Sequence, residues 1–112
     1  MHTWISKYKK EGATFSSGAE AYQDKNSLYP AELTANLTTF LTEAINQGIM
    51  VEMPTFEWDQ PTHTLSVIRK TEDPDGLLEY VINGGTWDDP AFVKYSADAG
   101  WVSLGISDFT PV

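Results

Sequence analysis

Residues 30–48 read PAELTANLTTFLTEAINQG, and this stretch decides the fold class. Its apolar residues recur at helical spacing and form one stripe, made of Leu33, Leu37, Phe40, Leu41 and Ala44. Pro30 suits the first position of a helix, and Gly48 supplies the left-handed residue that commonly ends one. The sequence therefore predicts a long amphipathic helix at about residues 30–47, which needs an apolar surface to cover its stripe.

After this helix the apolar spacing changes to two, which is typical of strands. The predicted strands are residues 49–58, 63–70 and 77–83, with turns at 59–62 and 72–76. The alternation slips by one residue at Pro54, as at a bulge or a strand break, because proline cannot donate to a ladder. These segments predict a three-stranded antiparallel meander.

A short helix is predicted over about residues 90–99, capped by Asp88 or Asp89 and ended by Gly100. Residues 101–106 alternate again and predict a last strand. The chain shows no internal repeat or linker, so we predict a single α+β domain over residues 1–112. Its expected architecture is a mostly antiparallel sheet of four to five strands, packed against the one long helix at about 30–47, with the short helix beside it.

The first 28 residues allow two interpretations. Four lysines lie within residues 1–25, together with the aromatic residues Trp4, Tyr8, Phe15 and Tyr22. In the first interpretation residues 3–8 form a strand, and the following loop packs on the core. In the second, residues 1–28 are a partly flexible arm, and residues 1–25 dock on a partner or on a second copy of the chain.

Composition excludes several classes of protein. The chain has 112 residues, a hydrophobic fraction of 41% and no cysteine, so disulfide frameworks and thiolate chemistry are excluded. No apolar run reaches the ~18 residues that a membrane span needs, and no secretory leader is recognisable. We expect a cytoplasmic protein, in the host cytoplasm if a phage encodes it.

Catalytic and metal-binding motifs are weak. His63 is the one plausible general base, and Asp59 and Ser66 lie near it in sequence, but no nucleophile motif accompanies them. The segment Asp73–Gly76 superficially resembles a calcium loop, but its flanks read as strands and not as the two helices of an EF-hand. We therefore predict no enzymatic activity, no metal and no cofactor.

The strongest functional signal is the acidic charge. The formal net charge is −9, and thirteen of the sixteen acidic residues follow Asn26, where three basic residues face them. The negative electrostatic field of so many acidic residues disfavours direct binding of nucleic acid or of anionic membranes. It suits a partner protein with a basic surface. Tryptophans beside the acids would supply anchoring contacts. The predicted partner-binding residues are Glu52, Glu57, Trp58, Asp59, Glu72, Asp73, Asp75, Glu79, Trp87, Asp88 and Asp89.

Two functions follow from these observations. The first is an inhibitor or adaptor, of the kind that phages encode, that occupies the nucleic-acid-binding surface of a partner protein and mimics the nucleic acid's charge. The alternative is a structural subunit of a virion or another assembly, whose N-terminal arm docks on its neighbours.

Overall fold

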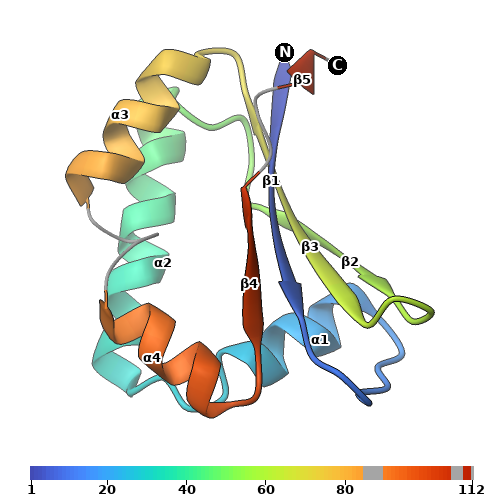
Figure 1. Cartoon of the computed structure of the whole chain (residues 1–112). Helices are drawn as coiled ribbons and strands as arrows, with labels where there is room; N and C mark the ends of the chain where they lie inside the picture. Colours follow the sequence, from blue (N-terminus) through green and yellow to red (C-terminus); the bar gives the residue numbers. More distant parts are fainter. Residues whose placement is uncertain (85–89, 107–109, 112) are drawn as a thin grey trace.

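The structure is a computed structural model that describes the backbone of residues 1–84, 90–106 and 110–111, and the side chains of residues 1–81 and 92–105. It contains five strands and four helices within these ranges. In chain order they are β1 (His2–Lys9), α1 (Gly18–Lys25), α2 (Ala31–Asn46), β2 (Thr55–Asp59), β3 (Thr64–Thr71), α3 (Pro74–Gly84), α4 (Pro90–Asp98), β4 (Val102–Ile106) and β5 (Thr110–Pro111). The predicted α+β class is confirmed (Figure 1).

The sheet is antiparallel throughout, and its strands lie in the order β2-β3-β1-β4, with β5 also paired to β1. Because side chains alternate along a strand, Trp4 and Ser6 of β1 lie on one face, beside Arg69 and Val67 of β3. The helices cover this face (Figure 1). No described helix covers the opposite face, where strand alternation places Ile5 and Lys7 of β1 with their partners Ile68 and Ser66 of β3.

The buried side chains form two clusters under the helices. One joins Trp4 to helices α2 and α3, and its buried members are Trp4, Leu41, Ala44, Met50, Leu77 and Val81. The other joins α1 to β2, β3 and the start of β4, with Ala21, Leu65, Val67 and Trp101 buried. The core is therefore divided, and both clusters border a shared space beneath the helices.

The helix predicted at 30–47 is confirmed as α2, and the short helix predicted at 90–99 is confirmed as α4. In α2, Leu41 and Ala44 are buried, while Leu37 and Phe40 pack against the first cluster. Gly48 has φ 73° and ends the helix, as predicted. However, α2 does not cover the sheet alone, because α1, α3 and α4 lie on the same face (Figure 1).

The prediction of a strand at residues 77–83 is wrong, because these residues belong to helix α3. The Asp73 carboxylate accepts the backbone N–H of Gly76 at 3.0 Å, and the Thr71 hydroxyl accepts the N–H of Asp73 at 2.9 Å. These bonds cap the first turn of the helix. Leu77 and Val81 then lie one turn apart and bury the same side of α3 in the first cluster.

The predicted first strand also begins later than expected, at Thr55 and not at residue 49. The end of α2 explains the difference. The N–H groups of Ile49 and Met50 both donate to the carbonyl of Ala44, at 2.9 and 3.1 Å, so this segment stays tied to the helix. Only the N–H of Val51 reaches the sheet, at the carbonyl of Lys70.

The arm interpretation of residues 1–28 disagrees with the structure. Strand β1 pairs with β3 on one side and with β4 and β5 on the other, so it is an interior strand. Residues 18–25 form helix α1, which the sequence prediction missed. A capping box marks its start, because Glu20 donates its N–H to the Ser17 hydroxyl and accepts the N–H of Ser16. The interpretation of a first strand packed into the core agrees with the structure.

Candidate ligand-binding site

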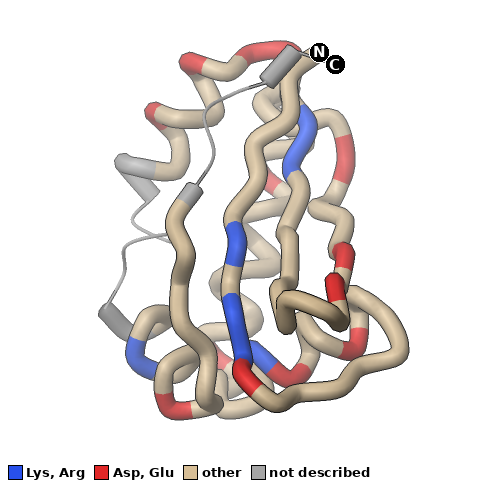
Figure 2. Tube along the Cα trace, turned by 45° about the vertical axis from the view of Figure 1, so that its right-hand side comes forward, with Lys and Arg blue, Asp and Glu red and all other residues tan. Residues whose placement is uncertain are grey.

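The predicted acidic residues fall into separate groups. Four exposed acids surround the start of α3: Glu72, Asp73, Asp75 and Glu79. Glu52 lies near them, since its carboxylate is 3.5 Å from the Lys70 ammonium group. Glu57 and Asp59 are exposed on β2, at the edge of the sheet. The acidic positions, red in Figure 2, are accordingly spread over several places along the chain. The remaining predicted partner-binding residues, Trp87, Asp88 and Asp89, lie outside the described residues.

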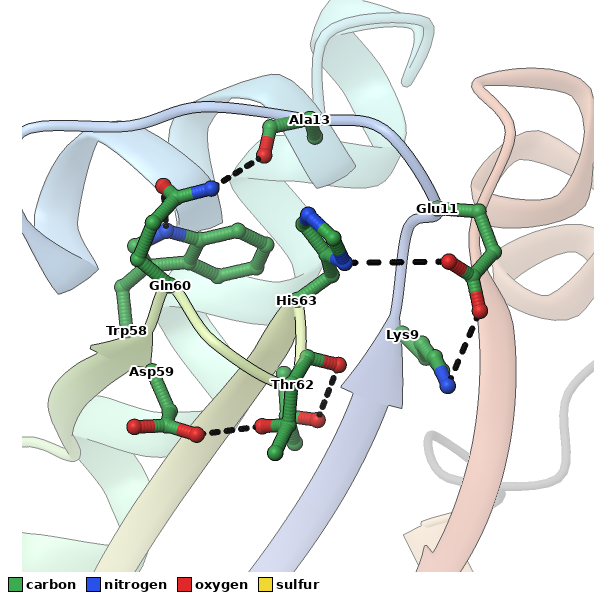
Figure 3. Close-up of polar contacts among 9 residues, drawn as sticks. Lys9, Glu11, Ala13, Trp58, Asp59, Gln60, Thr62 and His63 are labelled. Atoms are coloured by element: carbon green, nitrogen blue, oxygen red, sulfur yellow. Dashed lines mark hydrogen bonds and ion pairs between the residues drawn. The ribbon is translucent and has the colours of Figure 1, made fainter.

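Trp58 does not share a surface with these acids, because its side chain packs in the second cluster. Its ring meets Phe15 edge-on, with 4.9 Å between centroids, and lies 5.9 Å from Trp101. Its Nε1 donates to Gln60 Oε1 at 2.7 Å, and Gln60 Nε2 donates to the carbonyl of Ala13 at 2.8 Å (Figure 3). Trp58 therefore fastens the β2–β3 hairpin to the loop after β1.

His63, Asp59 and Ser66 do not assemble into a hydrolytic group. The Nδ1 atom of His63 lies 3.6 Å from the carboxylate of Glu11, while the Asp59 carboxylate accepts the hydroxyl of Thr62 (Figure 3). Ser66 lies on the sheet face that the helices leave open, because it alternates with the buried residues of β3. The side chains at this turn are engaged in local pairs.

The acidic turn before α3 serves as a helix cap. The Asp73 carboxylate accepts the backbone N–H of Gly76, as described above. Within residues 1–81 and 92–105, no three histidine or acidic side chains converge in a way that would hold a metal ion.

The best candidate for a binding site is a cavity of about 590 Å³ between the covered face of the sheet and the helices. Its volume lies in the range of pockets that hold small organic molecules. Aromatic side chains form much of its wall: Trp4, Tyr8, Tyr22, Tyr29, Phe40, Phe92 and Trp101. Aliphatic side chains from α2, α3 and the segment after α2 also line it, namely Leu37, Leu41, Met50 and Val81.

Lys25, at the end of α1, lines this cavity and is only 6% exposed. Its ammonium group lies 3.2 Å from the Tyr29 hydroxyl, 3.4 Å from Asn26 Oδ1 and 4.4 Å from the ring centroid of Tyr8. Burial lowers the pKa of Lys25 to about 8, and the positive charge of Arg69 contributes to the shift. No carboxylate among the described side chains pairs with this ammonium group.

Arg69, on β3, is the second cation in the cavity. Its guanidinium group lies 5.9 Å from the ring of Trp4, and its Nη1 donates to the Ser6 hydroxyl at 2.7 Å. The residue as a whole is half-buried, but burial of the guanidinium lowers the pKa of Arg69, while Tyr8 and Tyr22 partly oppose that shift. Among the described residues, Arg69 has no ion pair with a carboxylate.

Helix α4 and strand β4 form the exposed side of the cavity. Val93 of α4 and Val102 of β4 line it and are 56% and 63% exposed. Deeper in the cavity, the Tyr29 hydroxyl lies 2.9 Å from that of Ser96, and burial raises the pKa of Tyr29 to about 12. The cavity wall thus carries hydroxyl groups and two cations.

Comparison with known proteins adds no family or function to this geometry: no family model, curated protein or solved structure matches the chain. Among the described helices, none combines the length and the apolar character needed to cross a bilayer.

The sequence contained one signal for this site. Leu65, Val67 and Arg69 alternate along the strand predicted at residues 63–70, and Leu65 and Val67 are buried, so Arg69 lies on the same face. Lys25 gave no such signal, since α1 was not predicted. The cavity itself depends on how two separate clusters pack, which periodicity does not describe.

Proposed function

We propose that this protein is a non-catalytic binding protein for a small organic molecule with an apolar body. The observation that carries the proposal is the 590 Å³ cavity, whose wall is largely aromatic and aliphatic. A molecule that fills a space of this size gains dispersion contacts and buries its apolar area against this wall.

A neutral fluorescent probe, N-phenyl-1-naphthylamine, tests this proposal. We expect its emission to rise when the protein is added, because apolar surroundings brighten it, and to fall when a competing apolar ligand enters. The variant Ala97→Trp places a large ring on a residue that lines the cavity and should abolish the signal. Lys94→Trp is the matched control on the same helix, because Lys94 does not line the cavity.

Probe binding that is unaffected by Ala97→Trp, in a variant that retains the fold by circular dichroism, would contradict the proposal. A complete lack of probe binding to the native chain would do so too. Equal loss in Ala97→Trp and Lys94→Trp would assign the signal to a surface of α4 and not to the cavity.

The separation of charge between interior and surface favours a second function, the binding of a basic partner protein. Lys25 and Arg69 both line the cavity, so removing their charges from the formal −9 leaves −11 for the rest of the chain. Exposed apolar residues adjoin two of the acids in sequence: Leu78 precedes Glu79 on α3, and Val51 and Met53 flank Glu52. Acids with apolar residues among them suit an interface in which charge attracts and apolar contact holds.

A pair of triple variants separates this function from simple acidity. Glu72→Gln, Asp75→Asn and Glu79→Gln together remove three charges at the start of α3. Glu32→Gln, Glu43→Gln and Asp98→Asn remove three exposed charges elsewhere. We expect the native chain to capture basic proteins at low salt and to lose them at high salt. The first triple variant should fail to capture these proteins even at low salt, whereas the second should capture them as the native chain does. Equal capture by both variants would contradict this function.

A further inference from the structure

We propose that the ligand of this cavity carries a carboxylate, and that Lys25 and Arg69 bind this head group while the apolar body lies against α2 and α3. This inference rests on the proposed ligand-binding function and adds the chemical class of the ligand. It concerns the cavity's two cations, which the fold itself does not use in any ion pair with a described side chain.

The charge balance of the cavity is the first argument. Burying a charge is costly unless an opposite charge or strong hydrogen bonds compensate it. Here Lys25 and Arg69 line one cavity and repel each other, since Arg69 contributes to the lowered pKa of Lys25. Their described contacts are with hydroxyl groups, an amide and aromatic rings, all of them neutral. An entering anion would supply the charge that these neighbours lack.

Spare donors are the second argument. Arg69 has five N–H groups, of which the Ser6 hydroxyl accepts one from Nη1 and the Tyr8 side chain is a second hydrogen-bond partner, so further donors remain. Lys25 has three, directed toward the Tyr29 hydroxyl and, at a longer 3.4 Å, toward Asn26. A guanidinium fork matches the two oxygens of a carboxylate, so Arg69 can bind both oxygens while Lys25 adds a further bond.

The distribution of polarity is the third argument. The two cations come from α1 and β3, and hydroxyl groups come from β1, α1, the segment between α1 and α2, α4 and β4, whereas α2, α3 and the segment after α2 contribute the aliphatic residues Leu37, Leu41, Met50 and Val81. The cations and the aliphatic side chains of the cavity wall therefore come from different elements. A carboxylate suits this site better than a phosphate monoester, which carries nearly two negative charges near neutral pH and costs more to desolvate in an apolar wall.

Matched ligands of equal chain length test the inference. Displacement of N-phenyl-1-naphthylamine would be followed with dodecanoate, dodecan-1-ol, dodecylamine and dodecyl phosphate, each below its critical micelle concentration. We expect dodecanoate to bind at least about tenfold more tightly than the alcohol, because one charge-assisted hydrogen bond changes affinity by about that factor. The amine should bind more weakly than the alcohol, and the phosphate more weakly than the carboxylate.

Variants then assign the preference to the two cations. Lys25→Met and Arg69→Met should each reduce the affinity for dodecanoate about tenfold and leave the affinity for dodecan-1-ol within about threefold. Lys94→Met removes an exposed lysine outside the cavity and should leave both affinities unchanged. Circular dichroism checks that each variant is folded.

The outcomes distinguish the two levels of the proposal. If the neutral probe and the alcohol do not bind, the ligand-binding function itself fails. If they bind, but the acid and the alcohol have equal affinity in the native chain, the function stands and the carboxylate inference is overturned. A tenfold preference for the phosphate, or an acid preference that survives both cation variants, would also overturn it.

Discussion

Replacing the buried lysine by a residue of similar length tests the physical reasoning behind the site. In Lys25→Met the apolar contacts of the side-chain stem remain, and the charge disappears. The pKa of Lys25 falls from 10.5 to about 8 on folding, which at about 1.4 kcal/mol for each pH unit corresponds to about 3 kcal/mol lost to burial of the charge. The hydrogen bond to Tyr29 offsets about 1 kcal/mol. We therefore expect the ligand-free variant to be more stable by about 2 kcal/mol at pH 7.

The pH dependence of this gain identifies its cause. Below pH 8 the ammonium group is charged in both the folded and the unfolded chain, so its full cost is present. Between pH 8 and 10.5 the folded chain alone releases the proton, and the cost of Lys25 disappears as the pH rises. The difference in stability between the two proteins should thus fall from about 2 kcal/mol at pH 7 to near zero at pH 10.

Urea unfolding followed by circular dichroism measures both quantities, at pH 7, 8, 9 and 10. The comparison stops at pH 10 because burial raises the pKa of Tyr29 to about 12 in the folded chain. Above pH 10, Tyr29 therefore ionises in the unfolded chain before it ionises in the folded chain, which destabilises both proteins. A variant that is less stable than the native chain at pH 7 would refute the reasoning. So would a difference that does not change with pH, because packing and not charge would then account for it.

Three further substitutions test the packing of the fold. Gly18→Ala would place a Cβ atom 2.3 Å from the carbonyl oxygen of Phe56, so we expect a loss of about 1–3 kcal/mol in urea unfolding, and unchanged stability would contradict this close approach. Leu77→Ala should cost about 2–5 kcal/mol in the same assay, because Leu77 is fully buried between α3 and α2, and a cost below about 1 kcal/mol would show that this interface is misplaced. Asp73→Ala removes the cap on Gly76 and should lower both helix content and stability, the latter by about 1 kcal/mol, whereas a neutral result would show that the cap is dispensable.

Helix α2 could be predicted from the sequence because three signals coincide there. Its apolar stripe has one period, Pro30 marks its start and Gly48 ends it. These signals are local, so the helix did not depend on knowing what it packs against.

Helix α3 shows why a similar apolar run was misread. The run Leu77–Ile82 satisfies a period of two as well as a helical period, and residues 72–76 read equally well as a turn. What decides the outcome is the capping by Thr71 and Asp73, together with the burial of Leu77 and Val81 against α2. That second contact joins segments distant in sequence, which local periodicity does not report.

The candidate site was harder still to predict, because it contains buried cations, and charged residues are on average found at the surface. Lysine and arginine are rarely buried without a partner, so a sequence reading assigns them to the surface. Strand alternation places Arg69 inward, but the meeting of Arg69 with Lys25 depends on α1 crossing the same sheet face. The acidic residues, in contrast, were predicted to lie at the surface, and the described ones are exposed except Asp24. Asp24 is half-buried and accepts hydrogen bonds from Lys10 and Trp101.

The most direct test of the central claim is an NMR titration of the Lys25 side chain, selectively labelled with ¹³C and ¹⁵N, with and without dodecanoate. In the free protein we expect a pKa of about 8. Bound carboxylate should raise the pKa of Lys25 above its ordinary value of 10.5, because an adjacent negative charge favours the ammonium form. Dodecan-1-ol should not raise it. A pKa that dodecanoate leaves unchanged, under conditions where the ligand is bound, would contradict the claim.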